Sequence, residues 1–368
     1  MNGYMEKEPL TSREMVYAPV IIPTLCRDQH FIRCIESLRK NPWAKYTDLY
    51  IGLDYPAKEA HWDGYRKISA YLEQPLPEFH AVHIFRREKN VGAACNSGLL
   101  RKMVSKEYDR FLYLEDDLEV SPNFLEYMDK ALMEYEDDPN VVMVTGYAYP
   151  LEWKAKEAST VVRQGFNGSA WGMGMWNSKR TTIARYLRSY GLSKDFSHAF
   201  RTGCFDKMID RAIKDYVDLC ENGWGSKRAF LNNVTDIALR IYLAVQHKYV
   251  IMPLLSKVRN HGYDGSGIYC QRIEEIAGGD FCVDNYLFSA QPIDGSATFT
   301  LIEDQSFDTN LNQEILNQFD SVSLEVMENV WCRAKRIARY GRYGGVLLLI
   351  NRTIKKISRY LKGYLNVK

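Results

Sequence analysis

Phe111-Leu-Tyr-Leu-Glu115-Asp116-Asp117-Leu-Glu119 is the stretch of this sequence that decides its fold class. Four residues typical of a buried strand end abruptly in three consecutive carboxylates. Successive side chains of a strand point to opposite faces, so Glu115 and Asp117 are expected to point the same way at the strand end. Adjacent carboxylates repel one another unless a cation offsets them, and Mn²⁺ or Mg²⁺ prefers oxygen ligands. An acidic turn that caps a following helix is the structural alternative.

Similar apolar runs surround this stretch, and segments of helical period separate them. The runs cover residues 18–23, 49–53, 81–85, 111–114 and 141–145, and the helical segments cover residues 29–39, 59–72, 92–104 and 123–135. This alternation predicts an α/β fold with a mostly parallel sheet over about the first 150 residues. Such sheets bind ligands at the carboxyl ends of their strands, which is where the three carboxylates fall.

The pattern loosens after Pro150 into aromatic and glycine-rich loops. Helices are expected at residues 178–190, 204–220 and 234–246, and a strand is expected at residues 249–255. Residues 266–317 show no clear period and are expected to be irregular.

Composition excludes several classes of protein. The 368 residues are 46% hydrophobic and 26% charged, as in globular proteins, which excludes a disordered or collagen-like chain. The eight cysteines include no CxxC pair, so we expect reduced thiols and neither a zinc knuckle nor a disulfide framework. The N-terminal residues do not resemble a signal peptide, and no run of about 18 apolar residues occurs. The sequence therefore predicts a cytoplasmic protein without a transmembrane span.

Charge is distributed unevenly along the chain. Residues 331–368 contain 11 Lys or Arg and no Asp or Glu, which leaves 37 basic and 46 acidic groups in the first 330 residues. Apolar residues recur at helical spacing in this tail, at Ile350, Ile354, Ile357, Leu361 and Leu365. A basic amphipathic helix of this kind binds an anionic membrane surface, and a helix packed on the body is the alternative. Nucleic acid is not expected as a partner, because the acidic body repels phosphate backbones.

Three segments carry a resemblance to a known family. Ile22-Pro-Thr24-Leu-Cys-Arg27, Gly52-Leu-Asp54 and the acidic stretch continued to Tyr127 are similar to the nucleotide-sugar half of GT-A fold glycosyltransferases. Within that family the chain resembles N-acetylglucosaminyltransferase I and its bacterial family 2-like relatives. The resemblance spans about residues 16 to 270 and is strongest at the acidic stretch. It implies a GT-A (Rossmann-like) fold with a mixed sheet flanked by helices, a UDP-sugar donor, N-acetylglucosamine as the sugar, and Mn²⁺ or Mg²⁺ as cofactor.

The resemblance also implies roles for the residues at the matched positions. Thr24 and Arg27 would meet the uridine diphosphate, and Asp54 would accept the uracil N–H. Glu115 would belong to the nucleotide-sugar site, Asp116 would approach the ribose or sugar, and Asp117 would bind the metal directly. For Arg27 and Asp54 the alternatives are a solvated charge at a helix start and an ordinary turn aspartate.

Three loops complete the expected site. Asn90 precedes the small residues that open a helix, where a ligand can approach the backbone, and resembled enzymes have a comparable segment beside the nucleotide or sugar. Trp171 and Gly172 lie in a loop that the resemblance places beneath the donor sugar, with a core-packing loop as the alternative. His261 could bind metal or phosphate, and Ser266 could hold diphosphate oxygens, although a lone histidine is more often structural.

An inverting transferase needs a base that takes the proton of the attacking acceptor hydroxyl. Asp236 is the candidate because it heads an expected helix where the resembled enzymes carry their catalytic aspartate. Thr235 departs from the tandem acids of those enzymes, and an ordinary helix-start acid is the alternative.

The sequence thus predicts a metal-dependent inverting glycosyltransferase that moves a sugar from a UDP-sugar to a glycan or lipid-linked glycan acceptor. Its tail would hold it on the cytosolic face of a membrane, in bacterial surface-polysaccharide synthesis. The expected parts are a nucleotide-sugar-binding half (1–150), an acceptor and catalytic half of the same domain (151–270), an irregular extension (271–330) and a basic amphipathic tail (331–368). A sugar nucleotidyltransferase and a non-catalytic, membrane-associated sugar-binding protein are the alternatives.

Overall fold

The computed structural model describes residues 14–148, 160–165, 168–186, 239, 242–243, 246–264, 266–267 and 289–304. The chain divides into two compact units, the first comprising residues 1–181 and 248–313 and the second residues 182–247 and 314–368. Most described residues belong to the first unit. In the second, Tyr186 packs edge-to-face on Tyr242 with ring centroids 5.2 Å apart, and Gln246 Nε2 donates to the Tyr186 hydroxyl at 3.0 Å.

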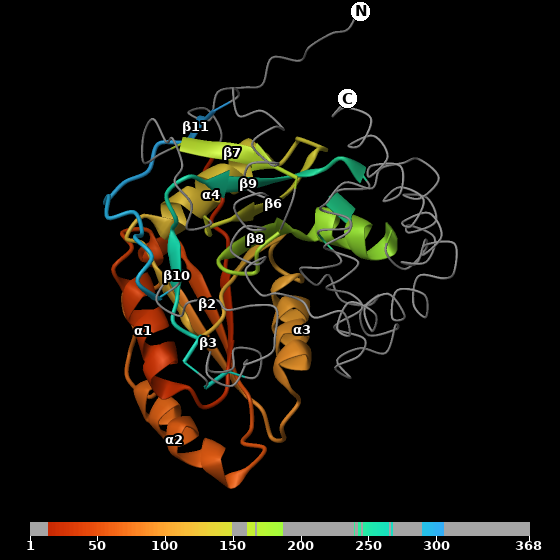
Figure 1. Ribbon diagram of the computed structural model, residues 1–368. Helices are drawn as coiled ribbons and strands as arrows, with labels where there is room; N and C mark the ends of the chain where they lie inside the picture. The colour runs from red at the N-terminus through yellow and green to blue at the C-terminus, as the bar shows by residue number, and fades with distance from the viewer. Residues whose placement is uncertain are drawn as a thin grey trace, which may run out of the picture. The chain divides into compact units, whose positions relative to one another are not determined.

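A mixed sheet forms the centre of the first unit (Figure 1). Its strands lie in the order β11-β7-β9-β6-β8-β4-β1-β2-β3. They are β1 (Val20–Thr24), β2 (Asp48–Leu53), β3 (Ala81–Arg86), β4 (Arg110–Tyr113), β6 (Val141–Thr145), β7 (Thr160–Gln164), β8 (Met173–Trp176), β9 (Tyr249–Pro253) and β11 (Ile302–Glu303). The expected α/β fold with a mixed sheet flanked by helices is confirmed.

The direction of the strands decides where their ends meet. Strands β4, β1, β2 and β3 are parallel neighbours, so their carboxyl ends share one edge. Strand β8 lies between β4 and β6 and is antiparallel to both. Its first residue, Met173, pairs with Tyr113 and Thr145, the last residues of β4 and β6. The chain that enters β8 therefore reaches the same edge.

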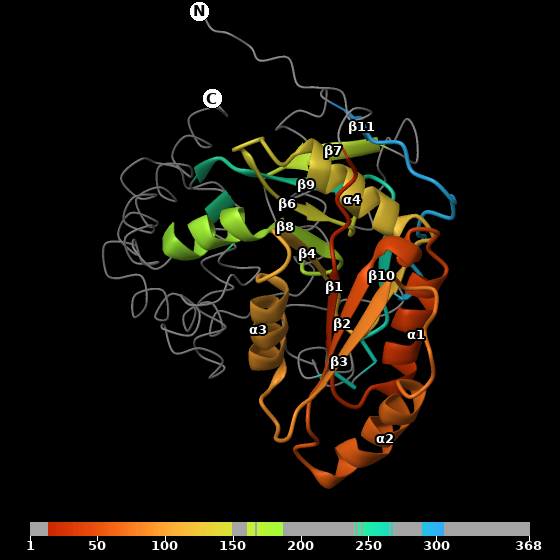
Figure 2. The same cartoon turned by 180° about the vertical axis from the view of Figure 1, so that it is seen from behind.

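Helices cover both faces of the parallel part of the sheet. They are α1 (Asp28–Arg39), α2 (Trp62–Tyr71), α3 (Ala93–Val104) and α4 (Phe124–Glu134), with short 3-10 helices at Ala44–Tyr46 and Glu59–His61. Figures 1 and 2 show α1 and α2 on one face of the sheet and α3 on the opposite face. No helix among the described residues is long and apolar enough to cross a membrane.

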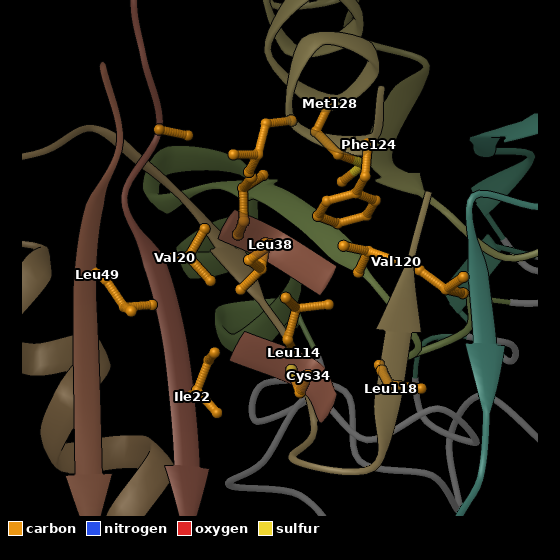
Figure 3. Close-up of a cluster of buried hydrophobic side chains, with 14 of the residues drawn as sticks. Val20, Ile22, Cys34, Leu38, Leu49, Leu114, Leu118, Val120, Phe124 and Met128 are labelled. Atoms are coloured by element: carbon orange, nitrogen blue, oxygen red, sulfur yellow. The ribbon is translucent and has the colours of Figure 1, made fainter. Parts of the chain in front are cut away.

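A continuous hydrophobic cluster joins the sheet to the layer that contains α1 and α4 (Figure 3). Val20 and Ile22 of β1, Cys34 and Leu38 of α1, and Phe124 of α4 all belong to it, and all are fully buried. Burial of each Val, Ile, Leu or Phe side chain contributes roughly 1.5–3 kcal/mol. The cluster therefore fixes α1 against β1, and Arg27 lies in the connection between them.

A second, two-stranded sheet brings distant segments to the acidic stretch. Strand β5 (Leu118–Val120) follows the three carboxylates directly and pairs antiparallel with β10 (Val258–Asn260). This pairing places the glycine-rich segment after β10, of which residues 261–264 and 266–267 are described, next to the turn that precedes β5.

Residues 289–304 are anchored to the rest of the first unit through a buried ion pair. Lys257 is fully buried and its Nζ donates to the Asp294 carboxylate, which also accepts the Asn123 Nδ2 at 2.7 Å. Strand β11 then extends the sheet by pairing in parallel with β7. The backbone over residues 290–301 is irregular, as expected, but the sequence did not predict its buried anchor or the short strand at its end.

The five strands and four helices predicted in the first 150 residues all occur, with ends shifted by three residues or fewer, and the strand expected at residues 249–255 is β9. The helix expected at residues 178–190 is present through residue 186. The helix expected at residues 204–220 and the basic tail at 331–368 lie outside the described residues, as does most of 234–246. Strands β5, β7, β8, β10 and β11 were not predicted.

Candidate functional site

The sheet topology brings most of the predicted site residues to one edge. Thr24 is the last residue of β1, and Asp54, Asn90 and the acidic turn come after the parallel strands β2, β3 and β4. Trp171 and Gly172 reach this edge because they enter the antiparallel strand β8. This is the edge at which parallel α/β sheets bind ligands.

The acidic turn lies between β4 and β5. Asp116 and Asp117 are both buried, each with 6% of its surface exposed, while Glu115 is half-buried. Strand β4 ends at Tyr113, so the alternation of an extended chain does not reach the acids. Asp116 and Asp117 share one partner. That Glu115 and Asp117 point the same way stays a prediction.

Arg27 is that shared partner. Its Nη1 donates to Asp117 Oδ2 at 2.8 Å, and its Nη2 donates to Asp116 Oδ1. Asp116 Oδ2 accepts the Thr24 hydroxyl at 2.8 Å. These bonds tie the acidic turn to the connection between β1 and α1, so the two carboxylates do not act as a cap of α4.

The charges of this cluster do not cancel. Burial raises the pKa of Asp116, and the Asp117 carboxylate adds to that shift while Arg27 acts against it. Burial acts to lower the pKa of Arg27, but the charges of Asp116 and Asp117 outweigh it and raise that pKa. Asp117 Oδ1 is buried and has no hydrogen-bond partner among the residues that the structure describes. With both carboxylates ionised the cluster carries a net negative charge and one unused acceptor.

The donor set fits a hard divalent cation that completes its shell from substrate. No group of three or more His, Cys, Asp or Glu side chains within the described residues is arranged to hold a metal ion. Mg²⁺-type cations in nucleotide sites often take only one or two carboxylates and leave positions for phosphates and water. A buried, unpartnered carboxylate oxygen at Asp117 meets that requirement. Asp117 as the metal ligand stays a prediction.

The glycine-rich segment after β10 approaches Asp117 closely. The His261 backbone N–H donates to the Asp117 carbonyl oxygen at 3.0 Å. A Cβ on Gly262 would lie 2.1 Å from Asp117 Oδ2, so only glycine fits there without displacing the carboxylate. The His261 ring lies 2.8 Å from Glu119 Oε2 through Nε2, which gives it a partner other than metal.

His30 holds the end of this segment and was not identified from the sequence. Its Nε2 lies 2.8 Å from Asp264 Oδ2 and 3.3 Å from the Ser266 hydroxyl oxygen. Ser266 is therefore placed beside the first turn of α1, close in the chain to Arg27. No local signal relates residues 30 and 264, and their contact follows only from the pairing of β5 with β10.

Asp54 has a structural role that the sequence did not reveal. Its Oδ1 accepts the backbone N–H groups of Tyr55 and Val91, each at 2.9 Å, and its Oδ2 accepts that of Gly92 at 2.8 Å. Asn90 Nδ2 donates to the Tyr55 carbonyl oxygen at 2.7 Å. Both side chains thus brace the loop between β3 and α3, and their contact with a nucleotide stays a prediction.

Trp171 packs between the end of β6 and the glycine-rich segment. Its ring lies edge-to-face with Tyr147 at 4.6 Å and with Tyr263 at 5.9 Å between centroids. Gly172 has φ +67°, a conformation that favours glycine, and its carbonyl oxygen accepts the Gly146 N–H at 2.7 Å. The Trp171 ring thus belongs to an aromatic group at the site edge. Asp236, the predicted base, lies outside the described residues.

Comparisons with known proteins complete the description of the site. No known protein family and no curated protein matches the sequence. Among solved structures, S. aureus TarS is 14% identical over 39% of this chain and 24% of its own, with a TM-score of 0.27. TarS 1-349 is 12% identical over 47% of this chain and 49% of its own, with a TM-score of 0.32. The chain thus spans half or less of these two structures.

A third solved structure covers more of the chain. The mannosyltransferase PcManGT from Pyrobaculum calidifontis, in complex with GDP-Man and Mn²⁺, is 12% identical over 97% of this chain and 86% of its own, with a TM-score of 0.36. With TM-scores below 0.5, none of these similarities establishes what this chain does.

Proposed function

We propose that this protein is a glycosyltransferase that uses a nucleotide-sugar donor and a divalent cation, Mn²⁺ or Mg²⁺. The observation that carries the proposal is the buried Asp116–Asp117 pair at the carboxyl edge of a parallel sheet, with Asp117 Oδ1 unpartnered. A buried carboxylate oxygen without a donor loses its hydration without compensation, and a bound cation would supply that compensation.

The neighbouring residues support a role in binding a diphosphate. The Arg27 guanidinium lies beside the acidic pair, and Gly262 keeps the adjacent backbone close to Asp117. In the proposed reaction Asp117 would hold the cation, and Arg27 would meet the diphosphate. The cation, when bound, would offset negative charge on the leaving nucleoside diphosphate. Asp236 would take the proton of the acceptor hydroxyl.

The finer features of the proposal rest on the sequence resemblance. UDP as the nucleotide, N-acetylglucosamine as the sugar and inversion at the anomeric carbon follow from the similarity at the acidic stretch. A glycan or lipid-linked glycan acceptor, a peripheral position on the cytosolic face of a membrane and a role in bacterial surface-polysaccharide synthesis follow from the basic tail. The proposed contacts of the nucleotide sugar are Asn90, Glu115, Asp116, Trp171 and Ser266.

Calorimetric titration of UDP, and of GDP for comparison, tests the donor site. We expect UDP to bind the full chain in the presence of Mn²⁺ and to lose that binding in EDTA or in an Asp117→Asn variant. The matched control is Asp63→Asn, since the Asp63 side chain is 80% exposed on α2 and pairs with Lys67.

Two further outcomes separate the alternatives. Release of a nucleoside diphosphate from a UDP-sugar supports a glycosyltransferase, whereas formation of pyrophosphate from a nucleoside triphosphate and a sugar 1-phosphate would identify a nucleotidyltransferase. If neither nucleotide binds wild-type protein with Mn²⁺, the proposed function is wrong.

A further inference from the structure

The Arg27 guanidinium already supplies positive charge where a cation is expected. It donates to Asp116 Oδ1 and to Asp117 Oδ2, the second bond at 2.8 Å. Asp116 is occupied at both oxygens, because Oδ2 accepts the Thr24 hydroxyl. Asp117 retains one buried oxygen, Oδ1, without a partner. A cation bound there would therefore share a single carboxylate with Arg27.

Two positive groups on one carboxylate repel each other. The Arg27 side chain is only 21% exposed and that of Asp117 only 7%, so water screens this repulsion less than it would at the surface. A divalent cation that binds alone must overcome the repulsion. A nucleoside diphosphate changes the balance, because its negative charge attracts both the cation and the guanidinium.

We propose that Arg27 couples the two ligands of the site: it opposes binding of the divalent cation alone and favours binding of the cation together with a nucleoside diphosphate. The inference rests on the proposed function for the identity of the diphosphate. It makes Arg27 a positioning residue whose charge keeps the acidic pair from holding a bare cation.

Calorimetry on the full chain with Mn²⁺ alone, UDP alone and Mn²⁺ at saturating UDP measures the coupling. For wild-type protein we expect each ligand to tighten the other by the same factor, roughly 5- to 150-fold as in other linked sites. Arg27→Gln removes the charge, so Mn²⁺ alone should bind at least about fivefold more tightly, which is the effect of one unit charge at about 4 Å in bulk water. The coupling factor should fall toward one, and UDP with Mn²⁺ should bind more weakly.

Two matched variants separate charge from packing. Arg27→Lys keeps the positive charge, and its affinity for Mn²⁺ alone should stay near that of wild type. Arg66→Gln makes the same chemical change at an exposed position of α2 and should leave all three titrations unchanged. As a check that does not depend on calorimetry, Mn²⁺ should raise the thermal unfolding midpoint of Arg27→Gln more than that of wild type, because tighter binding to the native state stabilises it more.

The proposal is overturned if Mn²⁺ alone binds Arg27→Gln no more tightly than it binds wild type, or if wild type shows a coupling factor of one. Failure of the proposed function reads differently. In that case UDP does not bind at all, while the comparison of Mn²⁺ alone between wild type and Arg27→Gln still reports whether Arg27 opposes a cation at the acidic pair.

Discussion

Asp129 on α4 gives the protein a stability that should depend steeply on pH. Its carboxyl is fully buried, Oδ1 accepts the Ala18 N–H at 2.9 Å, and Oδ2 has no hydrogen-bond partner. Burial raises the pKa of Asp129 to about 8, although the Ala18 N–H and the charge of Arg110 act to lower it. The native state therefore holds a proton that the unfolded chain releases near its ordinary pKa of 3.8.

The sign and size of the effect follow from this difference. Between about pH 4 and pH 8 the native state binds one more proton than the unfolded state, so the free energy of unfolding falls as pH rises. The slope from this single group is about 1.4 kcal/mol per pH unit, so the free energy of unfolding changes by several kcal/mol across this pH range. Asp129→Asn keeps an oxygen for the Ala18 N–H and carries no charge, so it should lack this slope.

Urea unfolding at several pH values between about 5 and 8 measures the difference directly. We expect Asp129→Asn to gain stability over wild type by about 1.4 kcal/mol for each pH unit. The exposed variant Asp63→Asn serves as the control and should follow wild type throughout. Parallel profiles of wild type and Asp129→Asn would refute the reasoning, because Asp129 would then be ionised in both states or in neither.

Three further predictions follow from single contacts. Lys257→Met leaves the Asp294 carboxylate buried without its ammonium partner and should lower the free energy of unfolding in urea by about 3–5 kcal/mol. Adding Asp294→Leu should recover much of that loss, and no recovery would contradict this account. Gly262→Ala places a Cβ 2.1 Å from Asp117 Oδ2, so Mn²⁺-dependent UDP binding should weaken by at least about tenfold in calorimetry, equivalent to ~1.4 kcal/mol. Unchanged binding would show that this carboxylate need not stay in place. Lys179→Met removes an ammonium that donates to three backbone carbonyls at 2.8–2.9 Å and should lower the unfolding free energy by about 2 kcal/mol, whereas a loss near zero would mean that water replaces it.

The sequence predicts the parallel half of the sheet well because its signals are local. Buried strands such as Val20–Thr24 and Val141–Thr145 are continuous apolar runs, and helices such as Asp28–Arg39 have a regular apolar period. The strand Met173–Trp176 has neither signal. Its place between two distant strands depends on backbone pairing that only the folded chain defines.

The candidate site was likewise predictable only where its sequence signals are local. Three consecutive carboxylates stand out in any sequence, and Arg27 was identified by resemblance. The sequence did not predict three contacts of the site. These are the bonds of Asp54 to backbone amides, the approach of Gly262 to Asp117 and the contact of His30 with the glycine-rich segment. Each joins residues far apart in the chain, so no local pattern of residue types encodes it.

The interleaved strand order has a consequence for synthesis on the ribosome. Strand β9 lies between β6 and β7, although it begins at residue 249 and β7 ends at residue 164, 85 positions earlier. At about 5–20 residues per second, the ribosome needs roughly 4–17 s to produce the missing neighbour. During that time β6, whose five residues are all buried in the finished protein, presents an unpaired apolar edge. The nascent chain is thus a natural client for chaperones that bind extended apolar segments until translation supplies the partner strand.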